Sequence, residues 1–208
     1  MSETTNNKSK KIFSTRNIVS CAMLSACAII LTYLEFPTFI APSFYRFNIS
    51  DLPALIGGFA MGPVAGVVIE FIKSLAMLIV NPANPTMGIG ELSNFVLGCI
   101  YVVPAALIYR SNKTKGRAVI SLVVGGLLMS VLAAVLNAFV MIPLYSTAFN
   151  LPVDSIIKMG SAIFPFVDNM FKFCLVCVLP FNIIKAIVVS VITIFIYKPL
   201  SVLIKGLN

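Results

Sequence analysis

The fold of this chain is decided by residues 119–144, which read VISLVVGGLLMSVLAAVLNAFVMIPL. This stretch holds no charged residue, and it exceeds the roughly 20 residues that an apolar helix needs to cross a bilayer. Over the whole chain of 208 residues, 59% are hydrophobic, 11% are charged and the mean hydropathy is +1.02. Because an average soluble domain carries about 25% charged residues, the sequence predicts an all-α integral membrane protein in a lipid bilayer.

Further apolar runs on both sides of this stretch predict six transmembrane helices in total. We expect the others at about 17–36, 51–62, 64–80, 91–108 and 180–197. Gly62-Pro63 separates the second helix from the third, because this pair favours a turn. Residues 145–179 are mixed in character and are expected to form an outer loop, with 170–178 either in that loop or starting the last helix. The domains are therefore a polar tail, 1–16, and a six-helix transmembrane domain, 17–208.

Lysine and arginine predict the orientation, because cytoplasmic loops of membrane proteins are enriched in these residues. With a cytoplasmic N-terminus, six helices place both termini and the loop 110–117 in the cytoplasm. Ten of the fifteen basic residues then lie inside: Lys8, Lys10, Lys11, Arg16, Arg110, Lys113, Lys115, Arg117, Lys198 and Lys205. We expect a multi-pass protein of the cell membrane, with N- and C-termini cytoplasmic.

Several functional classes are excluded by what the sequence lacks. It has no histidine, and the one CxxC pair, Cys174 and Cys177, has no second ligand pair, so we expect no metal site. It has no Walker A phosphate loop, so it does not hydrolyse ATP by that route. The basic residues lie in short loops without interleaved aromatics, which argues against nucleic-acid binding. We expect no catalytic residue, no cofactor and no enzyme activity.

Three polar side chains stand within expected membrane helices, where they are costly unless they face the protein interior. Asn182 and Lys185 share one face near the outer start of the last helix. Asn137 lies in the outer half of the fifth helix. We predict that all three bind a ligand near the outer surface. The alternatives are that Lys185 extends to the lipid headgroups and that Asn137 makes an interhelical hydrogen bond.

Other polar residues near the expected helices have simpler interpretations. Glu70 and Lys73 are spaced i,i+3 and are expected to form a structural ion pair. Ser50 or Asp51 is expected to cap the second helix. Asn94, at the start of the fourth helix, is a further candidate for the outer pocket.

The first outer loop, residues 35–50, combines aromatic and polar side chains. Such residues suit either an interfacial belt or a lid over a planar ligand. The candidates for ligand contact there are Phe44, Tyr45, Phe47 and Asn48. On the first helix, Ala22 and Ala26 form a small-xxx-small pair, which allows another helix to approach closely.

The chain resembles the S components of energy-coupling factor (ECF) vitamin transporters, and among them the riboflavin-binding RibU family. Four segments carry the resemblance: EFPTFIAPSFYRFNISDLPALIGGFAMGPVAGVVIEFIKSL (35–75), GELSNFVLG (90–98), LNAFVMIPLY (136–145) and PFNIIKAIVVSVI (180–192). The last two are the most specific to the riboflavin type, and Ala22 and Ala26 match the AxxxA docking motif of such subunits.

The resemblance implies a riboflavin-binding S component with its ligand pocket at the outer surface. It implies that Asn137, Asn182 and Lys185 hydrogen-bond riboflavin as a transported ligand. The implied partners are the ECF transmembrane coupling subunit, docked at Ala22 and Ala26, and two ATP-binding cassette ATPase subunits. The alternatives are an S component for another vitamin or a flavin analogue and, from a different class, a membrane enzyme or an independent carrier.

Overall fold

A computed structural model of the chain describes residues 14–38, 41–42, 45–80, 88–150 and 152–205. In chain order its elements are α1 Thr15–Tyr33, β1 Phe36–Pro37, β2 Arg46–Phe47, α2 Leu52–Met61, α3 Pro63–Val80, α4 Ile89–Ser111, α5 Lys115–Leu136, the π-helix η1 Asn137–Met141, α6 Ile142–Phe149, α7 Val153–Ser161, α8 Met170–Phe173, the π-helix η2 Cys174–Val178 and α9 Leu179–Lys205.

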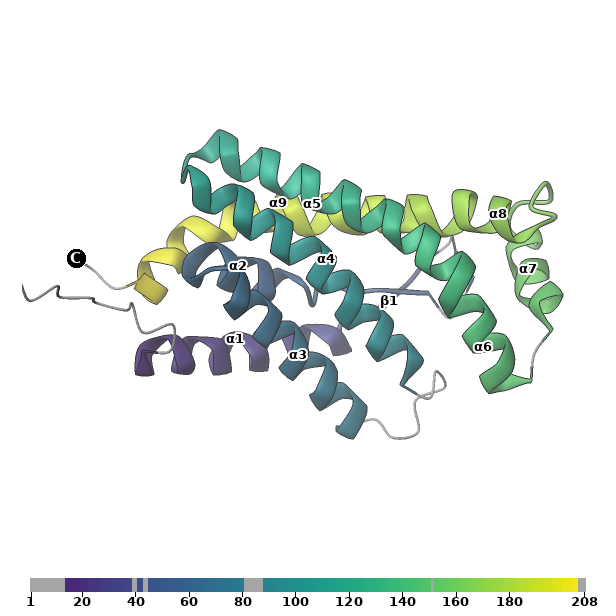
Figure 1. Cartoon of the computed structure of the whole chain (residues 1–208), viewed down its shortest axis with the longest axis horizontal. Helices are drawn as coiled ribbons and strands as arrows, with labels where there is room; N and C mark the ends of the chain where they lie inside the picture. Colours follow the sequence, from purple (N-terminus) through teal and green to yellow (C-terminus); the bar gives the residue numbers. More distant parts are fainter. Residues whose placement is uncertain (1–13, 39–40, 43–44, 81–87, 151, 206–208) are drawn as a thin grey trace, which may run out of the picture.

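The described residues form the predicted membrane-helix bundle. Five helical stretches are long and apolar enough to cross a bilayer, and the shorter apolar helix α2 is the sixth. The two longest stretches are α5 with its continuation to Ala148, and α8 through α9 to Pro199. Figure 1 shows these two side by side along the length of the molecule, with α6, α7 and α8 at the end opposite the C-terminus. The predicted fold class is confirmed.

α2 is only a half-length helix, and this shortness shapes the interior. It has 10 residues, or about 15 Å of helix, so it does not cross a bilayer alone. The predicted break at Gly62-Pro63 is confirmed: Gly62 has φ 113°, and α3 begins at Pro63. β1 and β2, which precede α2, lie near the middle of the molecule (Figure 1). The segment that enters α2 therefore carries Asp51, buried with 2% exposure, into the bundle.

The last membrane helix begins earlier than the sequence predicts. Helical structure runs without interruption from Met170 to Lys205, not from about Pro180, so 170–178 starts the last helix. Proline lacks the N–H that a continuing α-helix needs, which is why Pro180 suggested a helix start. The wider π-helical turn η2 lies directly before α9 and accommodates this proline at the second residue of α9. The π-helical turn η1 likewise lies directly before α6, whose second residue is Pro143.

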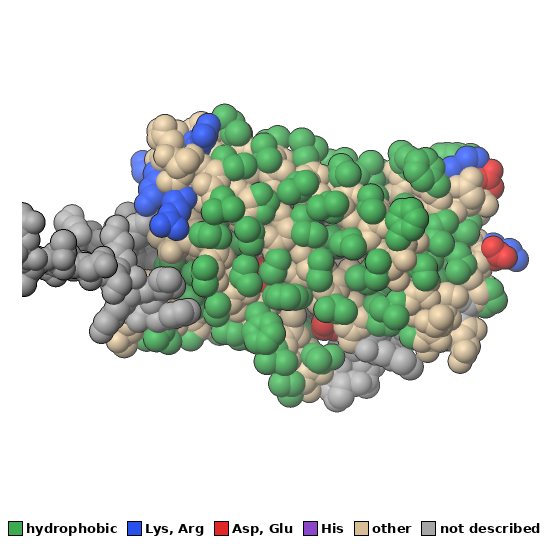
Figure 2. Space-filling view, in the orientation of Figure 1, with side chains coloured by type: hydrophobic (Ala, Val, Ile, Leu, Met, Phe, Trp, Pro, Cys, Tyr) green, Lys and Arg blue, Asp and Glu red, His purple; other side chains and the backbone are tan. Residues whose placement is uncertain are grey.

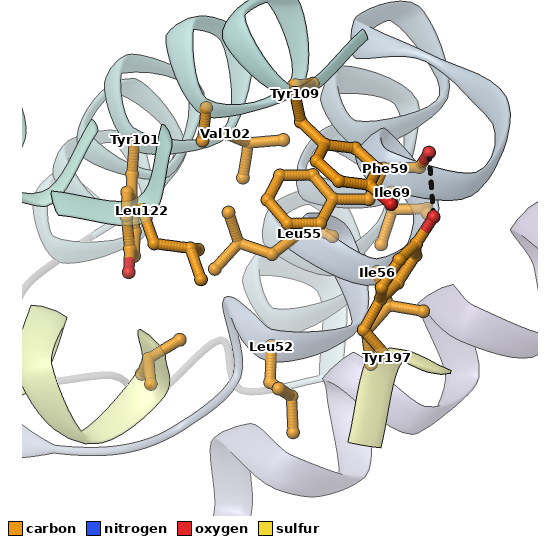
Figure 3. Packing of buried hydrophobic residues seen from close by; sticks show 14 of the residues in the cluster. Leu52, Leu55, Ile56, Phe59, Ile69, Tyr101, Val102, Tyr109, Leu122 and Tyr197 are labelled. Atoms are coloured by element: carbon orange, nitrogen blue, oxygen red, sulfur yellow. Dashed lines mark hydrogen bonds between the residues drawn. The ribbon is translucent and has the colours of Figure 1, made fainter. Parts of the chain in front are cut away.

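Three aromatic rings stand among aliphatic side chains in the core at the α2 end (Figure 3). The Phe59 ring stacks on Tyr109 with centroids 4.4 Å apart, and Tyr197 meets both rings edge-on. The Tyr197 hydroxyl donates to the backbone oxygen of Phe59 at 3.3 Å. This hydrogen bond and the ring contacts join α2, α4 and α9, so the half-length helix is held firmly although it does not span the bilayer.

The molecular surface is apolar, as a lipid-facing surface requires. Large hydrophobic side chains such as Ile79, Phe139 and Phe195 are more than two-thirds exposed. In Figure 2 they cover the visible side of the bundle, while lysine and arginine gather at the end that holds the α4–α5 connection. This distribution supports a multi-pass membrane protein with a basic end.

A close approach of α4 and α5 depends on Gly125, and this gives the first prediction. A Cβ there would lie 2.7 Å from the backbone oxygen of Tyr101. Gly125→Ala should therefore lower the free energy of unfolding by about 1–3 kcal/mol, measured as a lower thermal midpoint of the purified protein in detergent. Gly116→Ala is the matched control, because nothing lies within 4 Å of its added Cβ. Equal midpoints for the two variants would contradict the close packing.

Candidate functional site

Asp51 is the centre of a buried ionic cluster. One carboxylate oxygen, Oδ1, lies 2.8 Å from Lys73 Nζ, and the other, Oδ2, lies 2.8 Å from Lys185 Nζ. All three residues are at most 8% exposed. A buried charge is costly without a partner, so each lysine stabilises Asp51 and is stabilised by it. The cluster thereby ties the start of α2 to α3 and α9.

The cluster continues on both sides of Lys73. Glu70, one turn earlier on α3, lies with Oε2 2.6 Å from Lys73 Nζ, which confirms the predicted ion pair. Lys73 also donates to Ser50 Oγ at 3.3 Å, and Ser50 Oγ donates to Asn48 Oδ1 at 2.8 Å. The first loop is therefore connected to the ionic cluster through Asn48 and Ser50.

The predicted role of Asp51 was wrong. Asp51 stands at the N-cap position of α2, but its side chain makes no capping hydrogen bond; its carboxylate instead accepts from the two lysines. Extension of Lys185 to the headgroups is also wrong, because Lys185 is buried and paired. Charge counting signals that a carboxylate is missing, because Glu70 balances Lys73 and a buried Lys185 needs one more; Asp51 and Glu91, which each begin an apolar run, are both candidates by this count.

A second group of side chains joins the first loop to η1 and to the start of α9. Tyr45 donates its hydroxyl to Asn137 Oδ1 at 2.6 Å, and burial raises the pKa of the Tyr45 phenol, which keeps it protonated. The Tyr45 ring also lies 5.5 Å from that of Phe181, centroid to centroid. Phe181 directly precedes Asn182, so this contact brings the loop beside the start of α9.

The two asparagine amides are used in the same way. Asn137 Nδ2 donates to the backbone oxygen of Ala133 at 2.8 Å, and Asn182 Nδ2 donates to that of Val178 at 2.9 Å. Each amide is thus fixed by its own helix, with its oxygen directed elsewhere. Tyr45 donates to the Asn137 oxygen, whereas the structure gives Asn182 Oδ1 no hydrogen bond from the described residues. Asn182 lies one turn before Lys185, which links the amide group to the ionic cluster.

The remaining candidates fall into three groups. Phe47 is half-buried in β2 and packs against the core around Phe173. Asn94 is exposed on α4 and makes no hydrogen bond to the other candidates within the described part of the chain. Phe44 lies outside the described residues.

Ala22 and Ala26 are both exposed on α1. Their neighbours Cys21 and Ser25 are buried, so α1 turns one face to the bundle and leaves the two alanines on the other. This arrangement leaves the small-residue face accessible to a partner helix.

A shallow surface groove of about 360 Å³ lies elsewhere, where α4 and α5 meet. Its lining is apolar: Cys99, Ile100, Val103, Pro104, Leu107, Leu128 and Leu132. It offers no polar side chain to orient a polar ligand, and it is distinct from the two polar groups above. Among the described residues, no group of three or more Cys, Asp or Glu side chains is placed to hold a metal ion.

The ionic cluster gives a prediction about stability. Lys73→Met removes the ammonium that pairs Glu70 and should lower the free energy of unfolding by about 3–5 kcal/mol, because a buried carboxylate loses its partner. The measurement is the thermal midpoint in detergent. Lys172→Met is the matched control, since its pair with Asp168 is exposed and should contribute little. Glu70→Gln/Lys73→Met should recover much of the loss; a double variant as unstable as Lys73→Met would contradict the pairing.

Comparisons with known proteins agree with this architecture. The family model described as "ECF transporter, substrate-specific component" matches residues 16–197. Riboflavin transporter RibU of Staphylococcus aureus is 30% identical over 89% of this chain and 90% of its own length. Riboflavin transporter FmnP of Bacillus subtilis is 32% identical over 85% of this chain and 87% of its own length.

A solved structure leads to the same family. The S component of a bacterial ECF transporter superposes with a TM-score of 0.71 at 28% identity, covering 92% of this chain and 99% of the other. The family consists of transporter components, which confirms that the chain is not an enzyme. From the match over nearly its whole length, this chain belongs to the family of substrate-specific (S) components of ECF transporters.

Proposed function

We propose that this chain is the riboflavin-binding S component of an ECF-type vitamin transporter. It captures riboflavin at the outer face and delivers it inward together with an ATP-driven module, formed by a transmembrane coupling subunit and two ATP-binding cassette ATPases. The relatives in Staphylococcus aureus and Bacillus subtilis are both named riboflavin transporters, and this similarity supports the same ligand here.

One observation carries the proposal: Asn182 and Lys185, one turn apart on α9, have unused hydrogen-bonding capacity, and the Tyr45–Phe181 ring pair lies at the start of the same helix. Asn182 Oδ1 accepts no hydrogen bond from the described residues, and Lys185 Nζ has three donors, of which one meets Asp51. The Tyr45 ring lies 5.5 Å from that of Phe181, which directly precedes Asn182 in the chain. Riboflavin has flat apolar ring faces, carbonyl and imide groups along one edge, and a hydroxylated side chain. A riboflavin site therefore requires aromatic rings that pack on the faces of the flavin and polar atoms that hydrogen-bond its edges.

The basic end of the bundle supports the proposed orientation. Lys113, Lys115 and Arg117 stand at the α4–α5 connection, the end at which lysine and arginine gather (Figure 2). The positive-inside rule favours the cytoplasm for that end. The N- and C-termini are then cytoplasmic, and α6, α7 and α8 are outside. Riboflavin enters from the latter end in this proposal.

Riboflavin binding is the direct test. Protein purified in mild detergent from cells supplied with riboflavin should be yellow, with flavin absorbance near one equivalent. Asn182→Ala and Asn137→Ala should each weaken binding by roughly tenfold, since each removes a buried hydrogen-bonding group. Asn112→Ala is the control, because Asn112 is exposed at the basic end.

The outcome that would end this proposal is a colourless protein that also fails to bind added riboflavin. Displacement of bound riboflavin by thiamine, biotin or folate at equal concentration would instead favour an S component for another vitamin. Uptake by this chain alone in liposomes, without ATPase subunits, would favour an independent carrier.

Docking on the coupling subunit is tested separately on α1. Ala26→Trp places a large ring on the exposed small-residue face, which should abolish riboflavin uptake in cells while leaving riboflavin binding unchanged. Cys27→Trp is the matched control: Cys27 is also exposed on α1 but is turned about 100° from Ala26 and about 140° from Ala22 around the helix. Loss of binding in Ala26→Trp, or equal loss of uptake in both variants, would count against docking at this face.

A further inference from the structure

The ionic cluster is charge-balanced. It contains two carboxylates, Asp51 and Glu70, and two ammonium groups, Lys73 and Lys185, joined by the three ion pairs described above. With both carboxylates ionised and both amines protonated, the formal charges of these four buried side chains sum to zero. Each of the four is no more than 8% exposed, so water screens their charges weakly, and removal of any one leaves a net charge inside the bundle.

Lys185 links this balance to the proposed binding site. It lies one turn from Asn182 on α9, and Asp51 is its single ionic partner among the described residues. Without the Asp51 carboxylate, the Lys185 ammonium would face a bound ligand with its full positive charge. With that carboxylate 2.8 Å away, Lys185 donates hydrogen bonds from a locally neutral pair.

We infer that Asp51 is a positioning residue that sets the charge selectivity of the site. Its carboxylate holds Lys185 and cancels its charge, so that the site favours an uncharged flavin over the same flavin carrying a phosphate. This inference rests on the proposed function and adds to it the reason for a neutral ligand. Asp51 acts through Lys185 and needs no contact with the ligand itself.

The physical basis is the charge of the phosphate group. A phosphate monoester carries about −1.5 to −2 charges near neutral pH. In a weakly screened interior it gains no net attraction from a neutral ion pair and loses hydration. An unpaired ammonium attracts it over several ångströms, by an amount that corresponds to about a tenfold change in affinity or more. The sign of the cluster charge should therefore determine which flavin binds better.

The experiment measures dissociation constants for riboflavin and flavin mononucleotide with the full chain in detergent, and compares their ratio between variants. Asp51→Asn leaves the cluster with one excess positive charge and should shift the ratio toward flavin mononucleotide by about tenfold or more. Lys185→Gln leaves one excess negative charge and should shift the ratio in the opposite direction. Asp51→Asn/Lys185→Gln is balanced again and should return toward the wild-type ratio.

Two controls separate charge from structure. Asp168→Asn also removes a carboxylate, but from the exposed pair with Lys172, and should leave the ratio unchanged. Asp51→Glu retains the charge and should keep the wild-type preference. A merely structural role for Asp51 would weaken both ligands alike, without opposite shifts in Asp51→Asn and Lys185→Gln. If Asp51→Asn does not fold, Lys185→Gln and the balanced double variant still test the sign.

The possible outcomes are distinguishable. A wild-type protein that binds riboflavin, with a ratio that stays constant in Asp51→Asn and Lys185→Gln, would overturn this inference and leave the proposed function standing. A wild-type protein that binds neither flavin would overturn both. Opposite shifts in the two single variants, with restoration in the double variant, are the result expected.

Discussion

The structure depends on one carboxylate placed inside a membrane protein. Asp51 is nearly inaccessible, and its two oxygens each meet a lysine ammonium, from α3 and from α9. A lone carboxylate in this position would be strongly destabilising, and either lysine alone would be as well. The ion pairs therefore hold the start of α2 against the middle of α3 and the early part of α9. A more apolar interior would pack these helices with less specificity.

The half-length helix α2 is what makes this arrangement possible. A full-length helix would begin at the membrane surface, where water solvates a carboxylate and no buried ion pair is needed. α2 instead begins inside the bundle, after the first loop has entered it, and it is fixed at its other end by the rings of Phe59, Tyr109 and Tyr197. The same loop brings Tyr45 to Asn137. One segment thus supplies both the aromatic side chains and the neutralising charge that the proposed flavin site requires.

Much of this was predictable from the sequence, for physical reasons. Long apolar runs identify membrane helices because lipid tolerates little else, and the Gly62-Pro63 break and the Glu70–Lys73 pair follow from local spacing. The sequence left the start of the last helix open between about 170 and 180, because a proline usually marks a helix start, whereas a π-helical turn here places Pro180 within a continuing helix. The Asp51–Lys185 pair was missed because it joins residues far apart in sequence, and a capping role explained Asp51 from its neighbours alone.

The central claim is that a neutral, hydrogen-bonding surface on α9, balanced by Asp51, receives a planar uncharged vitamin. The most direct measurement is an experimental structure of the chain with riboflavin bound. The account predicts flavin polar atoms within hydrogen-bonding distance of Asn182 and Lys185, with the Asp51–Lys185 pair intact. A flavin bound in the shallow apolar groove between α4 and α5, or bound at α9 with Lys185 separated from Asp51, would contradict it.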